Sequence, residues 1–231
     1  MKKSKVFKKI VDELSGCFEK LPDYREGLNT RYEIKDAAVS AFSVFFTQSP
    51  SFLASQRLLQ KSKGKNNLQK LFGVEKIPTD TQTRNLLDPL APSLLSELFP
   101  YGINLLKEKG ILKKFESYAG QILISTDGTE TVSSQKLHCQ NCSHRELKNG
   151  ETHYFHSAIL PVIVKASNPR VLPLSPEFIT PQDGHEKQDC EREATKRWVK
   201  RNSAALKGWR YTMLGDDLYS NQPLCEAFLA A

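Results

Sequence analysis

Two segments of this sequence share one unusual feature, an apolar run that ends in a carboxylate. In Gln121 to Asp127, Ile-Leu-Ile precedes Ser-Thr-Asp, and in Tyr211 to Asp217, Met-Leu-Gly precedes Asp-Asp. Packing explains such residues poorly, because an unpaired charge at the end of a buried strand is costly. Two such strands side by side would form a hard, oxygen-rich cation site. The segments therefore predict a metal site of the kind used in phosphodiester chemistry.

Length and charge limit the classes of protein to consider. The 231 residues suffice for two modest domains or one large one. No apolar run approaches the ~20 residues that span a bilayer. The basic N-terminus is not followed by a continuous apolar segment, because Asp12, Glu13 and Ser15 interrupt it, so we expect no signal peptide and a cytoplasmic protein. The five cysteines are then expected to be reduced thiols or metal ligands.

The net charge of +7 favours a polyanionic partner such as DNA. Basic residues are concentrated between Arg57 and Lys76, although such a run is also compatible with an ordinary solvated face. The candidate DNA-binding residues are Arg57, Lys61, Lys63, Lys65, Arg84, Lys187, Arg197, Lys200 and Arg201.

The pattern of apolar residues changes near residue 116. Residues 1–115 follow helical spacing and are predicted to form a DNA-binding region, whereas 116–231 carry short apolar runs bounded by turn residues. The expected order in the second part is strand 122–126, strand 153–165 with a bulge at Pro161, strand 171–179, helix 186–201, strand 211–215 and helix 223–231. The predicted fold class is α+β, a helical half followed by an incomplete ribonuclease H-like mixed sheet with flanking helices. In such a sheet the first and fourth strands are neighbours, so their acidic ends converge.

A helix-turn-helix is one interpretation of residues 67–88. Helices at 67–72 and 80–88 flank Gly73, and the second carries Thr81, Gln82, Arg84 and Asn85, which suit contacts to bases and phosphates. The alternative is an ordinary helical hairpin.

Several motifs of the chain resemble bacterial insertion-sequence transposases of the DDE class. They are Ser-Thr-Asp-Gly-Thr from Ser125, Gly-Asp-Asp-Leu-Tyr-Ser-Asn-Gln from Gly215, Pro-Glu-Phe-Ile-Thr-Pro-Gln-Asp-Gly from Pro176, Glu-Lys-Gln-Asp-Cys-Glu-Arg from Glu186, Asp-Tyr-Arg from Asp23, Ser-Pro-Ser from Ser49, and Ile-Pro-Thr-Asp-Thr-Gln-Thr-Arg-Asn-Leu-Leu-Asp from Ile77. The likeness extends over nearly the whole chain.

The resemblance implies a metal-dependent enzyme that cleaves DNA and transfers strands between the ends of a mobile element and its target, with a homodimer on DNA as a further expectation. In that family three carboxylates hold two Mg²⁺ or Mn²⁺ ions. By position Asp127 is the first, and Asp216 is the preferred second because it directly follows the strand. Asp217 stays the alternative, since a shift of one residue reverses which side chain faces the site.

The third carboxylate of the family belongs to a helix beyond residue 231. Glu226 is the one acid after Asp217, and it precedes the segment that should carry the glutamate. The resemblance therefore predicts a truncated transposase that is inactive alone. The alternatives are a non-catalytic DNA-binding remnant of a mobile element and a metal-dependent nuclease.

A second group of metal-ligating residues lies between the two acidic segments. Cys139 and Cys142 form C-x-x-C, and His153 and His156 form H-x-x-H. These four residues would suit tetrahedral Zn²⁺, but the two histidines point to opposite faces of a regular strand. The alternative is a polar hairpin with reduced thiols and no metal.

Overall fold

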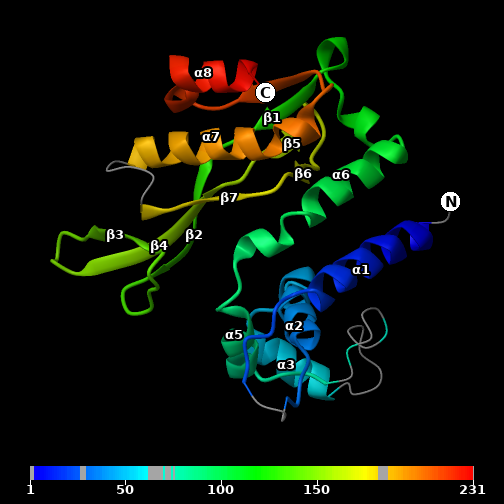
Figure 1. Ribbon diagram of the computed structural model, residues 1–231, viewed down its shortest axis with the longest axis vertical. Helices are drawn as coiled ribbons and strands as arrows, with labels where there is room; N and C mark the ends of the chain where they lie inside the picture. The colour runs from blue at the N-terminus through cyan, green and yellow to red at the C-terminus, as the bar shows by residue number, and fades with distance from the viewer. Residues whose placement is uncertain are drawn as a thin grey trace. The chain divides into compact units, whose positions relative to one another are not determined.

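The chain forms two compact units in the computed structural model, Met1–Leu98 and Phe99–Ala231 (Figure 1). It belongs to the α+β class, with helices in both units and a mixed sheet in the second. Among the described helices, none has the length and apolar character needed to cross a bilayer. The structure describes residues 3–26, 30–61, 70, 74, 76–181 and 187–230, with the backbone alone for 3–6 and 187–190.

The first unit is helical, as its spacing of apolar residues predicts. Phe18 and neighbouring apolar residues of the first helix are buried against Ala37 and Val39 of the second. The helix at 80–87 begins at Thr79, whose Oγ1 accepts a hydrogen bond from the Gln82 backbone N–H at 3.2 Å. The helices are α1 (Lys3–Glu19), α2 (Ile34–Phe46), α3 (Phe52–Lys61), α5 (Asp80–Leu87) and the 3₁₀ helix η1 (Pro92–Leu95).

A four-stranded mixed sheet forms the centre of the second unit. Its strands are β1 (Ile122–Ser125), β5 (Val162–Val164), β6 (Leu172–Pro173) and β8 (Tyr211–Leu214). They lie in the order β6-β5-β1-β8. The first three alternate in direction, and β8 returns parallel to β1 after a helical crossover. The expected neighbouring position of 122–126 and 211–215 is thus confirmed.

A second, antiparallel sheet extends from the first. It contains β2 (Gly128–Ser134), β3 (Ser143–Glu146), β4 (Thr152–Ile159) and β7 (Glu177–Ile179). β4 pairs with β2, with β3 along its first half and with β7 along its second. We call β2, β3, β4 and their connections the arm, which projects away from α7 (Lys187–Leu206) in Figure 1.

Proline explains where the predicted strands divide. The strand expected at 153–165 separates into β4 and β5 at Leu160 and Pro161, and the strand expected at 171–179 separates into β6 and β7 around Pro176. Proline has no N–H to donate to a neighbouring strand, so a continuous ladder is interrupted there. β2 and β3 were not predicted as strands, because their residues are mostly polar and exposed.

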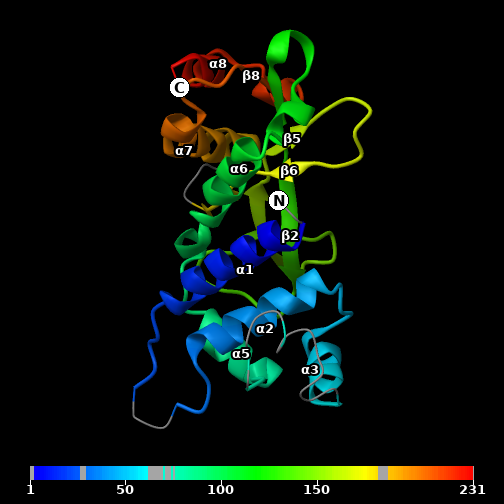
Figure 2. The ribbon, with the colours of Figure 1, turned by 90° about the vertical axis from the view of Figure 1, so that its right-hand side faces the viewer.

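One face of the central sheet packs against helices. Ile124 and Ile163 are fully buried with Ala194, Trp198 and Val199 of α7 in one apolar core. α7 and α8 pack against each other (Figure 1, Figure 2). The remaining helices of this unit are α6 (Leu98–Glu108), η2 (Leu112–Phe115), η3 (Tyr118–Gly120), η5 (Asp217–Tyr219) and α8 (Gln222–Leu229).

The division between the units lies between Leu98 and Phe99, whereas the sequence placed it at 115/116. The reason is packing: Ile103 and Leu112 are helical residues like those before them, but they are buried in the same core as β1. Helical spacing shows that a segment has an apolar face, and it does not show which core that face joins.

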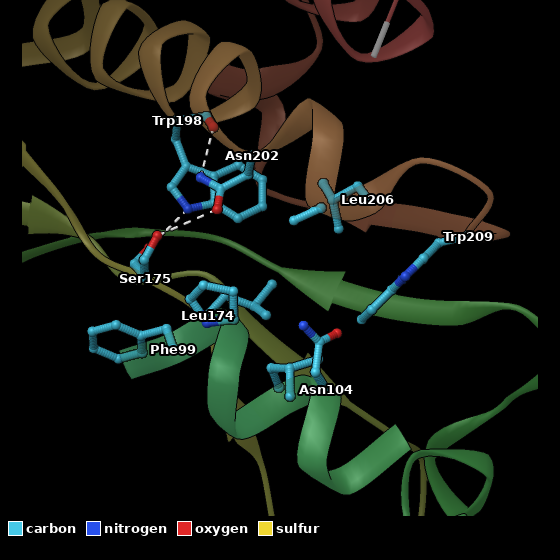
Figure 3. A pocket seen from close by; sticks show the side chains of 11 residues that line it. Phe99, Asn104, Leu174, Ser175, Trp198, Asn202, Leu206 and Trp209 are labelled. Carbon is cyan, nitrogen blue, oxygen red and sulfur yellow. Dashed lines mark hydrogen bonds between the residues drawn. The ribbon is translucent and has the colours of Figure 1, made fainter. Parts of the chain in front are cut away.

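Trp198 anchors α7 to the segment between β6 and β7. Its Nε1–H donates to the Ser175 carbonyl at 2.8 Å, and Asn202 Nδ2 donates to the Trp198 carbonyl at 2.8 Å (Figure 3). An adjoining cleft is lined by Phe99, Leu206 and Trp209 among others. Trp209 precedes the first residue of β8 and Asp216 follows its last, so the cleft and the acidic residues flank opposite ends of that strand.

Candidate active site

Asp127 and Asp216 lie at the carboxyl ends of two parallel, hydrogen-bonded strands. Ser125 of β1 is the register partner of Leu214 of β8, and the Thr126 N–H donates to the Leu214 carbonyl at 2.9 Å. Asp127 and Asp216 each follow this last pair by two residues. Neighbouring strands lie about 4.8 Å apart. The two aspartates therefore follow adjacent strand ends at one edge of the sheet.

The register also bears on the choice between Asp216 and Asp217. Directly paired residues of neighbouring strands point to the same face of a sheet. Ser125 and Leu214 are the last such pair; Asp127 and Asp216 each lie two residues beyond it, whereas Asp217 lies one residue further and begins η5. The register favours Asp216 as the partner of Asp127.

Local hydrogen bonds hold both carboxylates at the surface. Asp127 Oδ1 accepts from the Gly128 N–H at 2.8 Å, and Asp216 Oδ1 accepts from the Leu218 N–H at 3.1 Å. Both side chains are exposed. The sequence suggested that these carboxylates would be buried, at a cost in desolvation free energy. That cost does not arise, because the strands are partly buried and the acids that follow them are exposed. Exposed carboxylates can accept a hydrated cation.

Glu191 is a buried carboxylate beside this site that the sequence analysis did not single out. It lies on α7 and is only 5% exposed. Its carboxyl group packs against Gly128, where an added Cβ would stand 2.5 Å from the Glu191 Cδ. One signal was available: Glu191 precedes Ala194 and Trp198 by three and seven residues, which places an acid on the buried face of the helix.

Tyr219 links the acidic residues to α7. Its ring lies over Gly215, where a Cβ would approach to 2.8 Å, so Gly215 permits this close contact. Burial raises the pKa of the Tyr219 phenol, and negative charge on Glu191 and Asp127 raises it further. The neutral phenol is thus an available hydrogen-bond donor at neutral pH.

Two buried hydroxyl groups meet near these residues. Tyr219 and Thr126 are 7% and 4% exposed. Interaction of the Tyr219 phenol with the hydroxyls of Thr195 and Thr126 partly offsets the rise in its pKa that burial causes. The surroundings of Asp127 are therefore unusually polar for the edge of an apolar core.

We expect Gly128→Ala to lower the free energy of unfolding by about 1–3 kcal/mol, because its methyl group would overlap the Glu191 carboxylate. Urea denaturation followed by circular dichroism measures the change. Gly102→Ala is the matched control, since a Cβ at Gly102 in α6 meets nothing within 4 Å. Adding Glu191→Ala to Gly128→Ala should recover much of the loss. Equal effects of the two glycine substitutions would contradict the predicted contact.

The structure brings together three of the four residues of the Cys/His prediction. The Sγ atoms of Cys139 and Cys142 and the Nε2 of His156 approach one another closely. His153 does not join them, because it differs from His156 by an odd number of positions on β4 and therefore points to the other face. Its Nδ1 is buried without a hydrogen-bond partner among the described residues.

Three of the candidate DNA-binding arginines have an acidic partner. Arg84 Nη2 lies 3.9 Å from Asp80 Oδ2. The other two pair with one buried carboxylate. Arg197 Nε lies 3.1 Å from Glu177 Oε1, and Arg201 Nη1 lies 2.6 Å from Glu177 Oε2. Glu177 is 5% exposed, so the arginines compensate a carboxylate that would otherwise be buried without a counter-charge. Their charge is therefore partly neutralised within the fold.

The structure describes some of the other basic candidates and not the rest. Arg84 is exposed on α5, on a face that also presents Thr81, Gln82 and Asn85, while Thr83 and Leu86 are buried. Arg57, Lys61 and Lys200 are exposed. Apart from Lys70, which is helical and exposed, the predicted helix 67–72 lies outside the described residues, and so do Lys63, Lys65 and the side chain of Lys187.

Comparison of this chain with protein-family models, with curated proteins and with solved structures finds no match.

Proposed function

We propose that this protein is a DNA transposase of the DDE class, with Asp127 and Asp216 as the first two metal-binding carboxylates of its catalytic unit. One observation carries the proposal: β1 and β8 pair in parallel, and two residues after the end of each strand, at the same edge of the sheet, the chain carries an aspartate. In a ribonuclease H-like sheet the first and fourth strands meet in this way. The order β6-β5-β1-β8, with α7 before β8, supports a ribonuclease H-like assignment.

The donor set fits Mg²⁺ or Mn²⁺. Both ions prefer oxygen ligands, and Mg²⁺ keeps several waters and takes substrate phosphate as a further ligand. Asp127 and Asp216 are exposed after adjacent strand ends, which leaves room for water and for a phosphate group. When bound, the metal would activate a water or 3′-hydroxyl and stabilise the leaving oxygen of an in-line displacement.

Other residues of the chain support the two aspartates. Glu191 provides a further carboxylate next to Asp127, although it approaches from the α7 side of the sheet. Gly128 and Gly215 lack side chains where Glu191 and Tyr219 come close to the backbone. The buried phenol of Tyr219 carries a proton at neutral pH and can donate a hydrogen bond within this group.

The first unit is proposed to bind DNA. The exposed face of α5 carries Gln82, Arg84 and Asn85, side chains that suit bases and phosphates. The net charge of +7 adds a nonspecific attraction to the phosphate backbone. Affinity for DNA should therefore fall steeply with increasing salt, because counterions are released on binding.

Iron-directed cleavage of the polypeptide tests the metal site. Fe²⁺ bound in place of Mg²⁺ generates hydroxyl radicals with ascorbate and peroxide, and these cut the nearby backbone. We expect fragments that end near residues 127 and 216, and their yield should fall when Mg²⁺ is added. A Cys139→Ser background limits binding of iron at the thiols.

The outcome separates the candidate functions. Cleavage at both strand ends that Mg²⁺ suppresses supports the proposed metal site. Salt-dependent DNA binding without cleavage at either strand end would favour a non-catalytic DNA-binding remnant and would contradict the proposed chemistry.

A further inference from the structure

We propose that Cys139, Cys142 and His156 bind one Zn²⁺ ion that stabilises the arm, independently of the proposed chemistry at Asp127 and Asp216. The Sγ atoms are 3.8 Å apart, and the His156 Nε2 lies 3.4 Å from the Sγ of Cys139 and 3.3 Å from that of Cys142. With ordinary Zn–S and Zn–N bonds, a tetrahedral site requires about 3.8 Å between sulfurs and about 3.5 Å between sulfur and nitrogen. The three atoms thus already have nearly the spacing of a zinc site.

The local backbone positions the sulfurs of the two cysteines. The Cys142 N–H donates to the Cys139 carbonyl at 3.1 Å and closes a turn. The Asn141 N–H points to the Cys139 Sγ at 3.4 Å, and the Cys139 N–H points to the Cys142 Sγ at 3.3 Å. These N–H groups would hold the sulfurs in place and form charge-assisted hydrogen bonds to them once a metal is bound. The two sulfurs are free thiols well beyond the roughly 2.05 Å of a disulfide bond.

His156 is held in position by the strands around it. It lies on β4, and its carbonyl accepts a hydrogen bond from Thr131 Oγ1 at 3.2 Å, at the irregularity of β2 between Glu130 and Val132. A metal bound here would join the turn at 139–142 to the middle of β4. Residues far apart in the sequence would then be fixed by one ion.

The arm has little apolar material with which to stabilise itself. The interior residues of β2 are all exposed, and β3 is exposed along most of its length. Val132 and Leu137 are 63% and 76% exposed. Small structural elements without an adequate hydrophobic core commonly depend on a disulfide or a metal. Zinc at Cys139, Cys142 and His156 supplies that stabilisation, because binding energy at a site formed only on folding contributes to folding.

The fourth coordination position is assigned to solvent. His153 faces the other side of β4. His138 adjoins Cys139, but its ring stacks on Tyr154 with 4.2 Å between centroids. Among the described residues the site therefore has three protein ligands, which leaves one exchangeable position.

Zinc content and affinity of the full chain test the proposal. After dialysis in metal-free buffer with a phosphine reductant, we expect one equivalent of zinc by mass spectrometry of the metal. Cys139→Ser and His156→Ala should each weaken zinc binding, in competition with a chromophoric chelator, by more than the roughly 10–100-fold that loss of an outer-shell partner costs. Cys225→Ser, at an exposed cysteine on α8, and His153→Asn are the matched controls and should retain zinc.

Cobalt substitution gives a second readout that does not depend on stability. Co²⁺ in this site should show thiolate-to-metal charge-transfer absorption, reduced in Cys142→Ser and unchanged in His138→Ala. Far-UV circular dichroism of each variant checks that the second unit stays folded. The proposal is wrong if the wild-type chain binds no zinc at micromolar metal, or if His153→Asn or His138→Ala loses zinc to the same extent as His156→Ala.

Discussion

Replacing Asp127 or Asp216 with asparagine is expected to remove most Mg²⁺ and Mn²⁺ binding and any metal-dependent DNA cleavage by this protein. Asparagine keeps the size of the side chain and an oxygen that can accept from the Gly128 or Leu218 N–H. It removes the negative charge that a divalent cation needs. Metal ions contribute several kcal/mol to such reactions, and each ~1.4 kcal/mol is tenfold in rate, so we expect a loss of at least about 100-fold.

The measurement is a Mn²⁺ titration followed by electron paramagnetic resonance, together with nicking of supercoiled plasmid DNA. Asp217→Asn is the matched control, because it removes the same charge from the next residue of the chain. Its Mn²⁺ affinity should stay close to that of the wild type, since Asp217 begins η5 instead of continuing the register of β8. If Asp217→Asn has the larger effect, the assignment of Asp216 is wrong.

Trp198→Ala is expected to be the most destabilising single substitution proposed here, with a loss of about 3–5 kcal/mol in the free energy of unfolding. Trp198 of α7 is 1% exposed and belongs to the core that includes Ile124 and Ile163 of the sheet. Truncation leaves a large cavity and removes the hydrogen bond from the indole N–H to the Ser175 carbonyl. Both effects act on the same contact between α7 and the sheet.

Urea denaturation followed by far-UV circular dichroism measures this loss without depending on tryptophan fluorescence. Trp209→Ala is the control, because Trp209 is only partly buried and contacts the same core from its edge. We expect it to destabilise less than Trp198→Ala. A loss below about 1 kcal/mol for Trp198→Ala would contradict its central position in the core.

Strong periodic patterns in the sequence predicted most elements of the fold correctly. The helical first unit, β1, α7 and β8 are present where apolar spacing indicated them. The polar strands β2 and β3 were missed because they have no buried face to produce an alternating pattern. Their strand structure depends on pairing with β4. It is therefore determined by the neighbouring strand and not by their own residues.

The sequence indicated candidate site residues where their spacing along the chain is short. The C-x-x-C spacing indicated Cys139 and Cys142, but which histidine completes the group depends on the face of β4. Glu191 could not be assigned to the site from its spacing, because its approach to Gly128 results from the packing of α7 on the sheet. Arg197 and Arg201 have the charge expected of DNA-binding residues. Their ion pairs with buried Glu177 could not be predicted from the sequence, because they form only when α7 packs against β7.

The sequence by itself determined that Asp127 and Asp216 each follow a short apolar strand, because the alternation of apolar runs and turn residues is local. The neighbouring position of these strands was expected for a ribonuclease H-like sheet, and the tertiary structure established their parallel pairing and its register, since pairing across the crossover through α7 depends on the burial of Trp198 and its neighbours. It also decided that Glu191 and Tyr219 lie close to the acids. Local chemistry selected the residues, and long-range packing determined which of them meet.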